Sequence, residues 1–571
     1  MRSRPRRRGG VVMAMVDERL RAPELADNVR MREMPDSQPI RWVISAGTDR
    51  YFRVGADLAE LARALDGTRG VDDLCATLGD RWDRDRVLGG LGVLETMQVL
   101  TDDDGASPPT RQSRIRLIPP LTVQISLIGT AVHRILPGPS TRRVGTAARR
   151  LSAVTAAVIA AVALGCFATL VPTTIDALAT TIDLRVLATV IAVSLVATAV
   201  HEYMHAWALS RYGGRVNRMG VMLFYLVPAF FCDISDAWTL DSRRRRVVVA
   251  LAGGSVQAVV FAATAIAGVC ARQGGAGDDV VATLALVSAT SIVMVVVNLV
   301  PFVKLDGYIA LMSATDIPNL RDKSIVAFAD RVRAVLFGTH APAPLRRWLP
   351  WFGAACALVP VVLVYLAVSN WSGALAATGA VGDTIVMLLT CYLLLIVVAV
   401  IRRAVVRARA DGAGLMRTAV VGVLGAAVVF GVLGGVDVTR TTSVSYLRTG
   451  DTTLLVSTDR ATLARIGAGR EVTLLTNGVV LHHRVGRAET RAGVESARFP
   501  LSAVLPTRSP DLITPGYAVV VEASLDPSAP SSGLARVEVG RTSLGRDLVD
   551  RYLWPTSMRG GATDLWRWMT R

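Results

Sequence analysis

The chain has few of the side chains on which proteins build disulfide frameworks and nucleic-acid interfaces. Lysine occurs only at Lys304 and Lys323, and cysteine and histidine each occur six times in 571 residues. The cysteines form no C-x-x-C pair and none follows Asp437, which excludes a disulfide framework in the last segment. Aromatic residues make up 6% of the chain and do not gather with arginines on a basic face, so we expect no nucleic-acid partner.

Apolar sequence, by contrast, is abundant. Hydrophobic residues make up 51% of the chain and the mean hydropathy is +0.43. Several apolar runs are long enough to cross a hydrocarbon core of about 30 Å, which predicts a polytopic α-helical membrane protein. The net charge of +17 fits arginine-rich cytoplasmic loops and contact with the lipid bilayer.

The first 150 residues divide into three predicted parts. Residues 1–37 are rich in arginine and are predicted to form a disordered basic tail. In residues 38–104, two apolar runs flank a polar turn and predict a β-hairpin, and helically spaced apolar residues then predict three short helices. This is the pattern of a small winged-helix-like α+β domain. Residues 105–150, rich in proline and arginine, predict a linker with an interfacial segment.

The stretch YFRVGADLAELARALDGTRGVDDLCATL, with its order of hairpin and helices, resembles the PqqD-like domains. Those domains recognise precursor peptides in the biosynthesis of ribosomally made, modified peptides. In that family a leader peptide adds a strand to the edge of the sheet. The resemblance implies that residues 38–104 recognise a peptide, and a generic winged helix with another partner is the alternative.

The predicted membrane core covers residues 151–437. About seven spans are expected, at residues 151–171, 186–209, 247–271, 280–303, 349–368, 384–401 and 418–436. The shorter apolar run at 219–231 predicts a re-entrant or interfacial hairpin. Arginines cluster at alternate ends of the spans, which places the N-terminus in the cytoplasm and the C-terminus outside the cell membrane.

Residues 438–571 differ in kind from the core. Five short runs at 453–456, 472–475, 479–485, 518–523 and 535–539 predict strands. We therefore expect an extracytoplasmic β-rich domain. Its stretch GREVTLLTNGVVLHHRVGRAE resembles the barrel and lipoyl-like portions of membrane-fusion adaptor proteins.

The second predicted span ends in the sequence His201-Glu202-Tyr203-Met204-His205. Ionisable residues inside an apolar helix are costly and are interpreted first as functional. Residues i and i+4 share one helix face, so the two imidazoles can bind one zinc ion while Glu202 reaches a water molecule.

A catalytic zinc site needs a third protein ligand and an open position. Asp306 follows the fourth span and reaches the same predicted depth as His205. Nearby, Asn298, Pro301 and Gly307 predict a broken helix that exposes its backbone. The sequence therefore predicts one zinc ion held by His201, His205 and Asp306.

The HEYMH sequence, followed by N-x-x-P-x-x-x-L-D-G, resembles the site-2 protease family of intramembrane zinc metallopeptidases. The stretch SDAW and the extra spans resemble its branch of putative peptide zinc metalloproteases. The resemblance implies that His201, His205 and Asp306 are the zinc ligands, that Glu202 is the catalytic acid and base, and that Asn298 positions the substrate or stabilises the oxyanion.

The expected function is intramembrane cleavage of a peptide bond near the cytoplasmic side. The expected substrate is the leader of a ribosomally made, modified peptide, and a daptide-type pathway is one candidate. Two alternatives remain at this point: regulated proteolysis of a membrane signalling protein, and a non-enzymatic export or immunity factor. A transporter is a candidate partner, and the oligomeric state cannot be derived from the sequence.

Overall fold

The computed structural model describes most of the chain. It covers residues 22–26, 29–34, 41–46, 50–101, 114–118, 122–128, 136–139, 146–224, 227–376, 380–464, 466–491, 493–504, 507–508, 512–527 and 529–553.

Within these ranges, 7 helices are long and apolar enough to cross a membrane. Each overlaps one of the predicted apolar runs, so the chain has the architecture of a multi-pass membrane protein. These helices are α5 Thr146–Ala179, α6 Leu184–Arg211, α7 Arg243–Gln273, α8 Asp278–Leu299, α11 Leu349–Ala376, α12 Ala380–Ala410 and α13 Leu415–Gly435.

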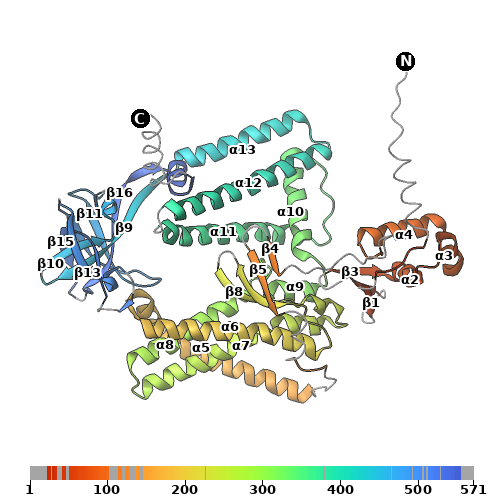
Figure 1. The fold of residues 1–571 in the computed structure, drawn as a ribbon, viewed down its shortest axis with the longest axis horizontal. Helices are drawn as coiled ribbons and strands as arrows, with labels where there is room; N and C mark the ends of the chain where they lie inside the picture. Colours follow the sequence, from red (N-terminus) through yellow and green to blue (C-terminus); the bar gives the residue numbers. More distant parts are fainter. Residues whose placement is uncertain are drawn as a thin grey trace.

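The helices form two groups (Figure 1). In the first group, α5, α6 and α8 pack around α7, and small alanine side chains lie next to Phe261 of α7. In the second group, α11 packs on α12 and on the shorter helix α10 (Leu320–Phe337). Small residues at such contacts let helix backbones approach closely in a bilayer. The short helix α9 (Asp306–Thr315) follows α8 and contacts α7.

A four-stranded antiparallel sheet lies between the two helix groups in Figure 1. The predicted hairpin at 219–231 is confirmed as β7 (Met219–Phe224) and β8 (Val227–Cys232). Two further strands, β4 (Ile115–Ile118) and β5 (Thr122–Ile128), extend the sheet beside β7. They correct the prediction that 105–150 is a linker. The alternation Thr-Val-Gln-Ile-Ser-Leu in β5 is a strand signal, which its proline- and arginine-rich surroundings obscured.

The N-terminal domain contains the predicted hairpin and three helices. Its strands are β1 (Val29–Met34), β2 (Arg41–Ala46) and β3 (Arg50–Gly55), and its helices are α2 (Ala56–Ala64), α3 (Val71–Leu78) and α4 (Arg84–Thr96). Strand β1 corrects the prediction of a disordered tail for residues 29–34, whereas residues 1–21, 27–28 and 35–37 of that predicted tail lie outside the described ranges. In β1, Val29 and Met31 alternate with charged residues, and both pack on the domain core.

The C-terminal domain is a β-barrel, closed by a pairing between β10 and β15. The predicted strand at 479–485 is wrong for most of its length, because β12 begins at Arg484. The long first strand β9 and strand β13 were not predicted. The strands are β9 Asp437–Thr449, β10 Thr452–Ser457, β11 Glu471–Thr476, β12 Arg484–Thr490, β13 Glu495–Pro500, β15 Ile513–Leu525 and β16 Ser532–Ser543, with short helices α14 Arg460–Ala464 and α15 Leu544–Leu548.

The two domains contact the helical core at opposite ends of α5 to α8 (Figure 1). The barrel contacts the turn between α5 and α6, where the short strand β14 (Thr507–Arg508) pairs with β6 (Ile182–Asp183). The N-terminal domain pairs through Arg53 with Asp316, directly after α9. His201 lies 17 residues into α6, about 26 Å from the barrel end of that helix.

Candidate metal centre

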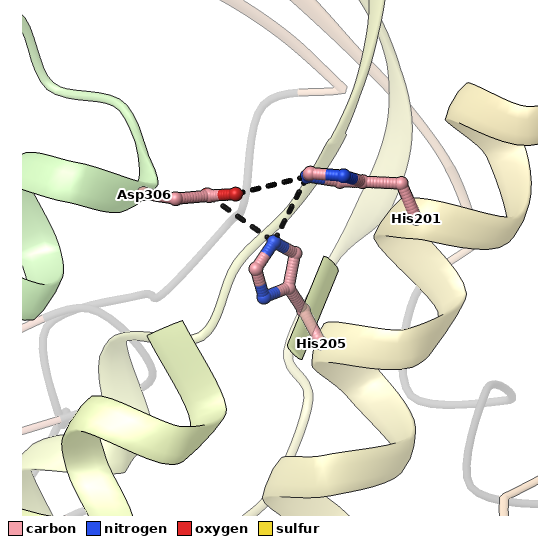
Figure 2. Close-up of side chains that lie close together, drawn as sticks. All are labelled: His201, His205 and Asp306. Carbon is pink, nitrogen blue, oxygen red and sulfur yellow. Dashed lines mark hydrogen bonds and ion pairs between the residues drawn. The ribbon is translucent and has the colours of Figure 1, made fainter. Parts of the chain in front are cut away.

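Three side chains that the sequence predicts as ligands meet at one point. His201 and His205 lie one turn apart on α6, both buried, and Asp306 is the first residue of α9. The two Nε2 atoms are 3.1 Å apart. Asp306 Oδ2 lies 3.0 Å from His201 Nε2, and Asp306 Oδ1 lies 3.2 Å from His205 Nε2 (Figure 2).

A break between α8 and α9 brings Asp306 to this position. The helix ends at Leu299, and residues 300–305 form a non-helical turn that contains Pro301. The backbone then approaches itself closely, because a Cβ at Gly307 would lie 2.2 Å from the carbonyl oxygen of Leu299. Glycine is therefore required at position 307, and the predicted broken helix is confirmed.

Hydrogen bonds behind the two rings fix which nitrogen carries the proton. His201 Nδ1 lies 2.6 Å from Gln257 Oε1, and His205 Nδ1 lies 2.8 Å from the carbonyl oxygen of Val249. A carbonyl oxygen only accepts, so each Nδ1 donates. A neutral ring with a protonated Nδ1 has its lone pair on Nε2, which is the arrangement that metal-binding histidines use.

The cluster therefore gathers three electron-rich groups with no donor of their own. Two Nε2 lone pairs and a carboxylate lie within 4.8 Å of one another, and Asp306 Oδ2, although buried, has no hydrogen-bond donor among the described residues. Buried acceptors without partners are costly, so a positive charge has to lie among them, either a proton or a metal ion.

The observed spacing fits a metal ion. Tetrahedral zinc, with bonds of about 2.0–2.2 Å, separates its ligand atoms by roughly 3.3–3.6 Å. The distances in the cluster, 3.0 to 3.2 Å, are slightly shorter than this. Two imidazoles and one carboxylate would leave one position of a tetrahedral ion open, as catalytic zinc sites do.

Helix α7 lies directly beside the two Nε2 atoms. A Cβ at Gly253 would lie 2.3 Å from His205 Nε2 and 2.5 Å from His201 Nε2. Gln257, one turn further along α7, holds His201. Sequence reasoning did not find Gln257 or Val249. The signal for Gln257 was its polar side chain within an apolar span, whereas Val249 acts through its backbone and leaves no signal.

Glu202 lies beside the cluster and does not belong to it. Its carboxylate Oε1 is 4.0 Å from His201 Nε2, and its side chain is 16% exposed. The backbone amide of Cys232, at the end of β8, faces the same carboxyl group. Glu202 thus lies next to the cluster without being one of its possible metal ligands.

Asn298 is not brought into the cluster. It lies in the last turn of α8, half-buried, and the group of possible metal ligands among the described residues does not include it. Its role in positioning a substrate stays a prediction.

Comparison with protein-family models, with curated proteins and with solved structures found no match for this chain.

Proposed function

We propose that the chain is an intramembrane zinc metalloendopeptidase of the site-2 protease type. The observation that carries the proposal is the buried cluster of three acceptors at the end of an apolar helix, with both histidine tautomers fixed for metal binding. A solely structural role would require neither an open fourth position nor a carboxylate beside it.

His201, His205 and Asp306 would hold the zinc ion. Bound zinc supplies a Lewis acid and lowers the pKa of a water molecule toward 7. Glu202 accepts a proton from the attacking water and delivers it to the leaving amine as the peptide bond breaks. Gln257 and the Val249 carbonyl keep both rings oriented throughout this exchange.

The sheet beside the site offers a way to hold an unwound substrate. Strand β8 is the last strand of the order β4-β5-β7-β8, and its end faces Glu202. A substrate segment in extended form can add by backbone hydrogen bonds to the edge of β8 that pairs with no other described strand, and only an extended segment exposes its amide to attack. In this proposal Asn298 stabilises the developing charge on the scissile carbonyl oxygen.

The proposed substrate is a precursor peptide whose leader is removed. The three-stranded sheet of the N-terminal domain supports this choice over a signalling protein or a non-enzymatic export role, because β3 pairs with β2 alone among the described strands. The edge of β3 opposite β2 can accept a peptide strand. A daptide-type pathway remains one candidate source of such a precursor.

Activity is tested with the purified full chain in detergent micelles with zinc and a library of apolar peptides, whose products are identified by mass spectrometry. We expect cleavage by the native protein. We expect a loss of at least about 1000-fold in the Glu202→Gln variant, because a missing general base and acid costs several powers of ten. Glu202→Gln should still bind one zinc ion. Cleavage by this variant at the native rate would refute the mechanism.

We also propose that the N-terminal domain is cytoplasmic and the barrel extracytoplasmic. Their contacts at opposite ends of α5 to α8 support opposite sides, and four consecutive arginines, 243–246, mark the end near the N-terminal domain. Alkaline phosphatase, which folds only outside the cytoplasm, should be active when fused after residue 553 and inactive when fused before residue 22. The reverse pattern would contradict this orientation.

A further inference from the structure

The N-terminal sheet presents a row of three residues on the face away from its helices. Arg32 on β1 pairs with Val43 on β2, which pairs with Arg53 on β3, so the three side chains share one face. The neighbouring residues Ile44 and Val54 point to the other face and belong to the helix-covered core. Val43 lies outside that core and is nevertheless 2% exposed.

Both ends of this row contact the membrane core. Arg53 Nη1 lies 2.6 Å from Asp316 Oδ1, and the two side chains are 11% and 12% exposed. The Arg53 guanidinium also stacks 4.7 Å from the ring centre of Trp238. At the other end, Arg32 Nε lies 3.7 Å from Asp241 Oδ1.

The helical core contributes a second arginine to the same carboxylate. Arg246 of α7 is 1% exposed and lies 2.8 Å from the same Asp316 Oδ1. It stacks on Trp238 at 5.3 Å, so the indole lies in contact with two guanidinium groups. Trp238 belongs to the short helix at Ser235–Thr239, and Asp316 caps the C-terminal end of α9.

Two contacts at this spacing fix an orientation as well as a position. Neighbouring strands lie about 4.8 Å apart, so β1 and β3 place their arginines roughly 10 Å apart. The Arg53 pair is largely shielded from water and screened little by salt, whereas the Arg32 pair is exposed and adds little affinity. Arg53 is therefore the anchor, and Arg32 limits rotation about it.

We propose that the row Arg32–Val43–Arg53 is a docking surface that seats the N-terminal domain on the C-terminal end of α9. Docking holds the free edge of β3 in one position relative to the metal-ligand cluster, because α9 joins Asp316 to Asp306. The use of this arrangement to present a peptide rests on the proposed function. The docking itself does not.

Docking is tested without catalysis, by hydrogen–deuterium exchange on the full chain in detergent micelles. Arg53→Glu reverses the anchoring charge and places it against Asp316. We expect exchange of the amides in 235–241 and 50–55 to rise roughly tenfold or more as the domain leaves the core. The matched control is Arg84→Glu, which makes the same charge change on the same domain at an exposed pair with Asp72 and should leave both segments unchanged.

Protection of α4 amides reports whether the domain itself stays folded. If Arg53→Glu unfolds it, Arg53→Gln removes the anchor without repulsion and should give the same rise. Exchange in 235–241 that is equal in the native protein, the Arg53 variant with a folded domain, and Arg84→Glu would overturn the docking surface. Docking without peptide cleavage would instead overturn the proposed function alone.

Discussion

Gly253 shows how closely α7 approaches the Nε2 atoms of His201 and His205 on α6. The next residue, Gly254, has open space where its Cβ would lie, whereas a Cβ at Gly253 would lie within 2.5 Å of both Nε2 atoms. The two adjacent glycines therefore differ in what an added methyl group would do.

We predict that Gly253→Ala lowers zinc affinity at least about tenfold, because the methyl group displaces one or both rings from the geometry that zinc needs. Gly254→Ala should bind zinc as the native protein does. Zinc content after dialysis against a graded zinc buffer, measured by mass spectrometry, compares the two. Equal zinc binding in both variants would show that the rings do not bind the ion through Nε2.

At the scale of single residues, sequence patterns were informative where a side chain was out of place in its surroundings. His201 and His205 were recognised by their i, i+4 spacing in an apolar helix, and Asp306 by its charge beside the next apolar run. The hydrogen-bond acceptors of the two Nδ1 atoms were not recognised from the sequence, because a backbone carbonyl such as that of Val249 has no sequence signature. The structure was needed to supply the tautomers.

Helix α9 links the candidate site to the rest of the core at the scale of elements. Its first residue is Asp306, and its C-terminal cap, Asp316, neutralises Arg246, which is 1% exposed and also donates to the carbonyl oxygen of Leu240. The helix is thereby held at both ends against α6 and α7.

We predict that Asp316→Ala destabilises the protein by about 3–5 kcal/mol, because it leaves the buried Arg246 charge without its carboxylate. Asp411→Ala is the control, since Asp411 is 48% exposed and lies 3.7 Å from Arg333. It should cost less than about 1 kcal/mol. Thermal unfolding in detergent micelles gives both values, and similar losses in the two variants would contradict the role of Asp316.

Helices and strands could be predicted from the sequence where one apolar pattern runs unbroken along the whole element. Seven long apolar runs became seven long helices, because a segment in lipid has to satisfy its own backbone hydrogen bonds. Strand β5 pairs with β7, about 100 residues away, and no local pattern contains that partner, while β4 joins the sheet only through β5. Strand β9 is polar and alternates weakly, so its place in the barrel is set by β10 and β16.

At the scale of the whole molecule, a bound metal ion would cross-link α6 and α9, because its ligands come from both helices. We predict that removing it with a chelator lowers the unfolding temperature, since a ligand at 100 times its Kd stabilises the folded state by about 2.7 kcal/mol. The His201→Ala variant should show no such shift, because it lacks one of the ligands. An equal shift in that variant would place the chelator-sensitive ion elsewhere in the protein.

The length of α9 has a consequence for any peptide that reaches from one domain to the other. Asp306 and Asp316 are ten residues apart, which is about 15 Å along a helix. An extended peptide covers about 3.3 Å per residue, so it needs at least roughly five residues to span that length. If the N-terminal domain is held in one place, the protein would therefore select precursors by the number of residues between the bound segment and the cleavage site. A precursor with too few residues there would be bound but not cut, and adding residues would restore cleavage.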